Sequence, residues 1–510
     1  MSKAYDYGAR EIWVLNVGDI KPGEIGIDQF LDMAWDMKKY QSFDQKSWLR
    51  DWAARTFDAR LAPQIAEVLD GYFRLNSVVK PEHIRLEDVA FSLDDYGDEA
   101  QRRLDDWAAL TRKVNAILPY IAPARRDAFT QLVAYPVRGA DLMNQKQIYA
   151  YRSRMQAAQG RVRANVDAAK ALAAYRAIQA ETDYYNTQMA GGKWNHMMSG
   201  NPRGQKVFKR PETGVVTPLN GAVMGVRAEG TPPEGDNTQT LPAFNSLLPR
   251  ARFVDIYNKG DAPIAWKAVA DAPWITLGQT AGQGDGRLLV SIDWSRAPQT
   301  EQVSGLVRVS DGVTNVPIEL NATRMTVAPN FNGFVENNGF ISMEAEDFTR
   351  ARAVGGAHWQ VINGLGRNSD AVAVFPTTTP SINADKPDWT RAPHLEYDLQ
   401  TLSAGKADIT VTCRPTHAIT PLRGLRYAIA IGDETPQIVG VDAKEYSRAW
   451  MFNINRAAAQ GQTKHRLGQG TQTLKIWMVD PGVVIDKIVV SRGELPPSFV
   501  GPPPTKIPIR

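Results

Sequence analysis

The sequence predicts a multidomain α + β protein, in which a short β/α unit and an α-helical bundle precede two β-sandwich domains. Only six of the 32 prolines lie before residue 202, and proline is excluded from helix interiors, so helices can dominate the first part. In that part apolar residues recur every three to four positions. After it, short apolar runs alternate with Gly, Pro, Asp and Asn, which is typical of sandwich strands.

Length and composition exclude several classes of protein. A chain of 510 residues predicts about three domains. Lys and Arg total 59 against 55 Asp and Glu, with no basic stripe, so we expect no nucleic-acid partner. We find no apolar run long enough to span a membrane and no apolar leader, so we expect neither membrane insertion nor a signal peptide on this chain.

The single cysteine, Cys413, excludes an internal disulfide. It ends an alternating run, ADITVTC, in which every second residue is apolar. This pattern predicts a small apolar residue on the inner face of a strand. A catalytic thiol would need a setting that lowers its pKa, and the neighbouring residues do not indicate one.

The first predicted element is IWVLNVGD, residues 12–19. Its nearly continuous apolar run predicts a strand buried on both faces, as in parallel sheets. The run ends in Asn16, Gly18 and Asp19, and polar groups at the carboxyl end of such a strand usually face a ligand crevice. Only eleven residues precede the run, so this chain does not supply the neighbouring strands of its sheet. Without them we expect residues 1 to about 20 to be poorly ordered or docked on the helices.

Helices are expected from residue 22 to about residue 195. Pro22 marks the start of the first helix, and Asp44 is predicted to cap the next one. Residues 145–188 predict either one long helix or two helices that part near Gly160. We assign residues 1–42 to the β/α unit and residues 43–200 to the bundle.

Two β domains follow, an immunoglobulin-like sandwich over residues 201–328 and a second sandwich over residues 329–510. Asp311 and Gly312 predict a hairpin turn in the first of them. The second opens with SMEAEDF, which places Glu344, Glu346 and Asp347 within four residues. In a strand, Glu344 and Glu346 share one face. Two interpretations stay open: a solvated edge strand, or a cation held between the carboxylates.

The acidic run, taken with TLKIWMVDPGVVIDKIVV near the end of the chain, resembles the β-sandwich of carbohydrate-binding modules. That resemblance implies a structural calcium held by Glu344, Glu346 and Asp486. No other cofactor is expected, and the six scattered histidines do not have the spacing of a zinc site. Trp359, Trp389 and Trp450 are either core residues or platforms for sugar rings.

A wider resemblance covers almost the whole chain. YGAREIWVLNVGDIKP followed by FLDMAWD, then GGKWNHMM, then the region from ISMEAEDF through HWQVINGLGR to VDPGVVIDKIVV, is similar to glycoside hydrolase family 115, the xylan α-1,2-glucuronidases. It implies that IWVLNVGD is the eighth strand of a (β/α)8 barrel, with Asn16 and Asp19 at the substrate-binding mouth. For Asp19, a structural role in the following loop is an equal alternative.

The resemblance implies a function, and it also shows what the chain lacks. A (β/α)8 barrel needs about 250 residues, and about 40 are present here. We therefore expect the C-terminal part of a hydrolase acting on (4-O-methyl)glucuronic acid side chains of xylan, inactive by itself and with its catalytic acid and base unknown. Xylan or glucuronoxylan oligosaccharides are the expected partners.

An alternative is a non-catalytic protein that binds carbohydrate or forms a homodimer. For the full-length relatives, the resemblance implies a periplasmic or extracellular location.

Overall fold

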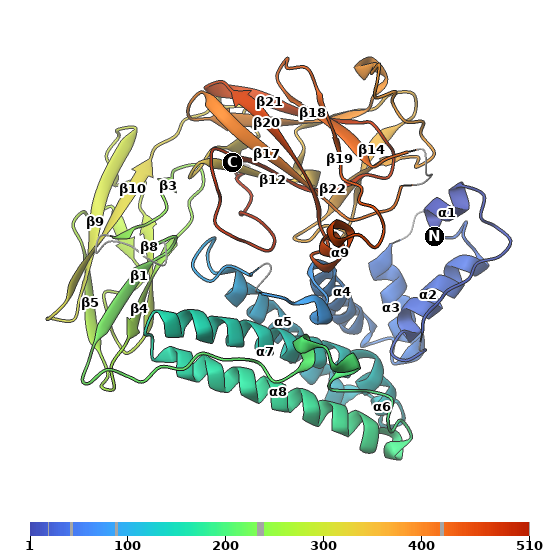
Figure 1. The fold of residues 1–510 in the computed structure, drawn as a ribbon, viewed down its shortest axis with the longest axis horizontal. Coiled ribbons are helices and arrows are strands. Elements are labelled where there is room, and N and C mark those ends of the chain that lie inside the picture. The colour runs from blue at the N-terminus through green and yellow to red at the C-terminus, as the bar shows by residue number, and fades with distance from the viewer. Residues whose placement is uncertain (19, 41–43, 87–89, 232–238, 419–422, 509–510) are drawn as a thin grey trace. The chain divides into compact units, whose positions relative to one another are not determined.

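The computed structural model describes residues 1–510 except 19, 41–43, 87–89, 232–238, 419–422 and 509–510 (Figure 1). The described chain forms two compact units. One comprises Met1–Ile84, Arg102–Ile148 and Lys170–Pro211, and the other comprises Arg85–Gln101, Tyr149–Ala169 and Glu212–Arg510. Helices together with several multistranded sheets confirm the α + β class in outline. The predicted domain boundaries, the barrel remnant and the bundle stay predictions.

The α-helices before residue 190 are α1 (Ser2–Asp6), α2 (Glu24–Trp35), α3 (Gln45–Thr56), α4 (Ala62–Val78), α5 (Glu99–Ile117), α6 (Arg126–Phe129), α7 (Tyr135–Ala158) and α8 (Arg163–Thr187). A π-helical turn, Thr130–Ala134, connects α6 to α7. The core of the first unit is built from buried apolar residues such as Trp48, Ile65, Trp107 and Phe129. None of the described helices is both long enough and apolar enough to cross a bilayer.

One local prediction about these helices is confirmed, and one open alternative is decided. Asp44 caps α3, because its carboxylate accepts hydrogen bonds from the backbone N–H groups of Lys46 at 3.2 Å and Ser47 at 3.3 Å. The stretch from 145 to 188 forms two helices, which part at Gly160. Gly160 has φ +70°, a left-handed conformation that favours glycine and ends a helix.

The buried strand predicted at residues 12–17 is not formed, and the run is exposed, as expected of a strand without its neighbours. Ile12 is 83% exposed and Val14 is 84% exposed. A strand without hydrogen-bonded neighbours gains little from its extended conformation, and its apolar side chains stay in water. Only Trp13 docks, with its ring edge-to-face against Phe30 of α2 at a centroid distance of 6.1 Å.

The first sandwich consists of two sheets. One has the order β1-β4-β8-β6, and the other has the order β2-β10-β9-β5-β7 with β3 paired to β10. Their bounds are β1 Met224–Ala228, β2 Gln239–Thr240, β3 Phe244–Asn245, β4 Arg252–Asn258, β5 Ala265–Ala270, β6 Ile275–Leu277, β7 Ala281–Gln283, β8 Gly286–Ile292, β9 Gln302–Ser310 and β10 Asn315–Thr323. Val254, Leu288, Val307 and Leu320, from both sheets, share one core. The β9–β10 hairpin turns at Asp311 and Gly312, as predicted.

The second sandwich also has two sheets, β11-β16-β21-β18-β19 with β13 on β16, and β14-β15-β22-β17-β20 with β12 on β22. Their bounds are β11 Phe334–Val335, β12 Phe340–Glu344, β13 Arg350–Arg352, β14 His358–Ile362, β15 Ala371–Phe375, β16 His394–Thr401, β17 Gly405–Cys413, β18 Arg426–Ile431, β19 Gln437–Gly440, β20 Ala459–Leu467, β21 Gly470–Met478 and β22 Val484–Ser491. Helix α9 (Arg448–Asn455) precedes β20.

Cys413 lies fully buried in the core of the second sandwich, as predicted. Burial raises the pKa of its thiol well above the ordinary value, so the thiolate that a nucleophile needs is disfavoured.

Candidate functional site: a buried charge cluster in the second sandwich

Of the two residues predicted to bind substrate, the structure describes Asn16. Asn16 is exposed, and its side-chain oxygen accepts a hydrogen bond from the backbone N–H of Gly18 at 3.3 Å. Asp19 lies outside the described residues. Their roles at the mouth of a barrel therefore stay predictions.

The structure instead assembles a polar cluster just after that segment, which the sequence analysis missed. The Lys21 ammonium donates to Glu24 at 2.7 Å and to Gln131 at 2.9 Å, and it lies 4.4 Å from the ring centroid of Trp194. Burial, together with the charge of Glu24, raises the pKa of Tyr185 to about 12. Lys21 and Trp194 both belong to motifs quoted above. Neither motif contains a pattern that predicts the contact between them, because the two residues are far apart in the sequence.

Two further acids of the N-terminal segment are held in structural contacts. Asp28 pairs with Arg55 at 2.5 Å. Asp32 lies 3.5 Å from the same guanidinium and accepts a hydrogen bond from the Trp48 indole at 2.9 Å. Both carboxylates thus stabilise the packing of α2 against α3.

The predicted metal residues lie around an irregularity in β22. Thr412 pairs with Lys487, and the next residue, Cys413, pairs with Ile485. Asp486 is therefore the extra residue of a β-bulge, which changes the direction of the side chains that follow it. Ile485 and Ile488 both belong to the apolar core. The bulge thus lets two consecutive charged residues, Asp486 and Lys487, lie between them without entering that core.

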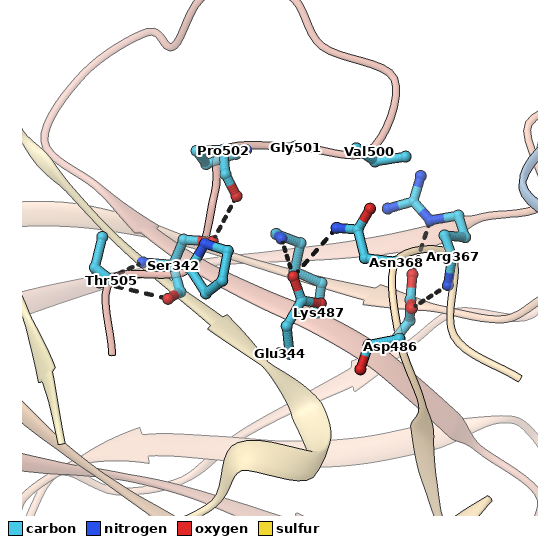
Figure 2. Close-up of polar contacts among 12 residues, drawn as sticks. Ser342, Glu344, Arg367, Asn368, Asp486, Lys487, Val500, Gly501, Pro502 and Thr505 are labelled. Carbon is cyan, nitrogen blue, oxygen red and sulfur yellow. Dashed lines mark hydrogen bonds and ion pairs between the residues drawn. The ribbon is translucent and has the colours of Figure 1, made fainter. Parts of the chain in front are cut away.

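Lys487 forms the first of two buried ion pairs, shown in Figure 2. It is the cross-strand neighbour of Glu344 on β12, and its ammonium donates to a Glu344 carboxylate oxygen at 2.6 Å. The Asn368 amide donates to the same oxygen at 3.1 Å. Lys487 is 1% exposed and Glu344 is 6% exposed. Glu344 is therefore neither on a solvated edge nor free to bind a metal.

Arg367 and Asp486 form the second pair. The guanidinium donates to one Asp486 oxygen at 2.7 Å, and the backbone N–H of Arg367 donates to the other at 2.8 Å (Figure 2). Asp486 is 1% exposed. Each of these two carboxylates thus has one cationic donor and one neutral donor.

Glu346, the third predicted ligand, has different surroundings. It lies in the turn after β12, where it accepts hydrogen bonds from the Ser369 hydroxyl and, at 3.2 Å, from the backbone N–H of Asp370. Its other carboxylate oxygen is buried without a hydrogen-bond partner. Burial raises the pKa of Glu346. Its contacts differ from those of Glu344, although the two residues are only two positions apart.

These residues do not fit a calcium ion. Calcium takes six to eight oxygen ligands at 2.3–2.6 Å. Here the Lys487 ammonium and the Arg367 guanidinium already neutralise two of the three predicted ligands. Throughout the described part of the chain, no three His, Cys, Asp or Glu side chains come together in a way that could hold a metal.

The same sandwich contains a cavity of about 350 Å³ next to α9. Its lining includes the half-buried ring of Trp450 together with His417, Arg423 and Asn453. A neighbouring aromatic ring, Tyr446, is 79% exposed and lies 5.2 Å from Trp450. Of the three predicted platform residues, Trp359 is in the core and Trp389 packs against Trp477, which leaves Trp450 beside a cavity.

Comparison with known families places the chain among glycoside hydrolases. Residues 1–83 match the model of glycosyl hydrolase family 115, and residues 333–504 match the model of the C-terminal domain of that family. The chain belongs to glycoside hydrolase family 115.

Among solved structures, the chain is similar to a family GH115 4-O-methyl-α-glucuronidase, BtGH115A, described as having specificity for decorated arabinogalactans. The identity is 21% and the TM-score is 0.60, over 97% of this chain and 47% of that one. This likeness shows a shared fold. The chain thus spans about half the length of that relative.

Family 35 carbohydrate-binding modules also match part of the chain. One from Clostridium thermocellum has 14% identity and a TM-score of 0.20, over 30% of this chain and 96% of that one. Another, described as Xyl-CBM35 in complex with a disaccharide containing glucuronic acid, has 11% identity and a TM-score of 0.20, over 31% and 97% of the two chains. No curated protein matches the chain.

Proposed function

We propose that this chain is the C-terminal part of a glycoside hydrolase that removes (4-O-methyl)glucuronic acid from xylan side chains. The observation that carries the proposal is the match of both ends of the chain to models of one glycosidase family, in residues 1–83 and 333–504. The similar GH115 enzyme is described as specific for decorated arabinogalactans, so that glycan is the alternative substrate class. The whole enzyme would act where it meets such polysaccharides, in the periplasm or outside the cell.

We further propose that the described chain does not hydrolyse glycosides by itself. Inversion at a glycosidic bond needs a general acid and a general base about 6.5–9.5 Å apart. In the N-terminal segment, Asp28 and Asp32 are engaged by Arg55, and Glu24 is engaged by Lys21. These pairs support structural roles for the three carboxylates.

The test is an assay of the purified chain on glucuronoxylan and on a glucuronic-acid-decorated arabinogalactan, with product sugars separated by anion-exchange chromatography. We expect no release of glucuronic acid above the no-enzyme blank. Robust release from either glycan would contradict the claim that the chain is inactive, and the glycan hydrolysed would identify the substrate class.

A second candidate function is non-catalytic binding of a glycan, which the cavity beside Trp450 favours. An aromatic ring next to amide and guanidinium donors is a common way to hold a pyranose ring, because the ring stacks while the donors meet hydroxyl groups. The homodimer stays a prediction.

The binding candidate is tested by pull-down on insoluble xylan with the full chain and two tryptophan variants. We expect Trp450→Ala to lose at least about tenfold in binding, which corresponds to about 1.4 kcal/mol. Trp35→Ala is the matched control, because Trp35 is 92% exposed and lies in the other unit. Equal retention of both variants, or equal loss by both, would argue against the cavity as the binding site.

A further inference from the structure

The two buried ion pairs of the second sandwich carry an inference that does not depend on the catalytic role of the chain. We propose that the Lys487 ammonium and the Arg367 guanidinium are the resident cations of this cluster, so that the second sandwich folds and stays folded without calcium. The carbohydrate-binding modules that this domain resembles would hold a metal among acidic residues. In this chain, side chains of the domain itself supply the positive charge.

The charges of the four central residues balance. Glu344 and Asp486 contribute two negative charges, and Lys487 and Arg367 contribute two positive ones. All four are less than a tenth exposed. Taking such charges out of water is costly unless each is paired and hydrogen-bonded. The ion pairs and hydrogen bonds described above meet this requirement with side chains of the domain itself. The two carboxylates therefore need no positive charge from a metal ion.

The Lys487 ammonium occupies the place at which a calcium ion would bind Glu344. Lys487 Nζ lies 2.6 Å from the Glu344 oxygen, close to the distance at which a bound calcium would lie from the same atom. Two cations cannot share that place, because like charges at such separation repel strongly in a site of low dielectric constant. A calcium ion would have to displace a lysine that is anchored in the middle of β22.

The C-terminal tail covers this place. Gly501 has φ +86°, and a Cβ atom there would lie 3.3 Å from the Lys487 side chain, so the backbone of the tail packs directly on the lysine stem. The tail is fastened on both sides. The Ser342 hydroxyl donates to the Pro502 carbonyl at 2.9 Å (Figure 2). On the other side, the Arg367 guanidinium donates to the Phe499 carbonyl at 2.8 Å. Figure 2 shows the tail, from Val500 to Pro502, running past Lys487, which is 1% exposed.

The second oxygen of Glu346 has no hydrogen-bond partner. A direct titration with calcium would detect an ion bound among the carboxylates of the cluster, and it would equally detect an ion bound through Glu346 alone.

The first test uses the unmodified full chain after dialysis against EDTA. Calorimetric titration with calcium chloride should give no saturable heat. The Tm of the chain should differ by less than about 1 °C between 5 mM calcium and 5 mM EDTA. A ligand that binds only the native chain, at a concentration well above its Kd, would instead raise the free energy of unfolding by several kcal/mol. Stoichiometric binding, or a Tm that rises by several degrees with calcium, would overturn the proposal.

The second test removes the proposed cation. Lys487→Met keeps the length of the side chain but leaves Glu344 buried and unpaired, so we expect the Tm of the second sandwich to fall by roughly 5–10 °C. Adding Glu344→Gln to the same chain removes the orphaned charge and should restore more than half of that loss. A Lys487→Met chain as stable as the unmodified one would overturn the role of the lysine, whether or not calcium binds.

Lys506→Met provides the matched control. Lys506 pairs with Asp347 of the same domain at 2.7 Å, but both side chains remain about a third exposed. Exposed pairs contribute little, so this variant should lose less than about 2 °C. Neither test uses catalysis as its readout, so failure of this proposal and failure of the proposed hydrolase function can be told apart.

Discussion

At the scale of single residues, Lys146 shows how burial changes the chemistry of a side chain in this protein. It lies in α7, fully buried, and its ammonium donates to the backbone carbonyls of Val207 at 2.6 Å and Lys209 at 3.4 Å. Those carbonyls are neutral acceptors, and they do not compensate for the loss of water around the charge. Burial accordingly lowers the pKa of Lys146 from its ordinary 10.5 to about 8.

This lowered pKa predicts that the Lys146 contribution to stability increases with pH. Below pH 8 the lysine is protonated in both the native and the unfolded chain, so its contribution does not change. Between pH 8 and 10.5 the unfolded chain holds the proton that the native chain releases, so the free energy of unfolding rises. From pH 7.5 to pH 9.5 we expect a rise of about 2 kcal/mol.

The measurement is urea unfolding of the full chain and of Lys146→Met at both pH values. The difference between the two chains isolates the lysine from other groups that titrate in the same range. We expect the pH-dependent gain to be larger in the unmodified chain. The same pH dependence in both chains would contradict a lowered pKa for Lys146.

At the scale of elements, the sequence predicted those caps and turns that depend on residues close together in the chain. The Asp44 cap and the turn at Asp311 and Gly312 were predicted, and the break at Gly160 was one of two alternatives. Each depends on residues within a few positions of one another. The alternation that ends in Cys413 also identified its strand and its buried face. Such features follow from hydrogen bonds and backbone conformations available to a short peptide.

The features that the sequence did not predict arise where distant residues meet. The run at residues 12–17 has the composition of a strand, but a strand needs partners and none of the described strands pairs with it. The sequence singled out Glu344 as a residue of a solvated edge strand or as a metal ligand, because its partner Lys487 lies 143 positions away. The bulge at Asp486 that permits the pair is not apparent in the sequence. Lys21 and Trp194 meet in the same non-local way.

At the scale of the whole molecule, the family assignment rests on both ends of the chain. The N-terminal match covers residues 1–83, and the C-terminal match covers most of the second sandwich. The similar GH115 structure is about twice as long as this chain, which covers 47% of it. Residues 1–83 therefore have the sequence of the family, but residues 12–17 within them form no strand in this structure.

Amide hydrogen exchange of Val14 and Leu15 in the monomeric chain tests that claim most directly. Without hydrogen-bonded neighbouring strands, both amides should exchange within seconds at neutral pH, far faster than the core amides of α4 around Ile65. Protection of Val14 and Leu15 comparable to that of Ile65 would show that the segment forms a stable strand within this chain, and it would contradict the account.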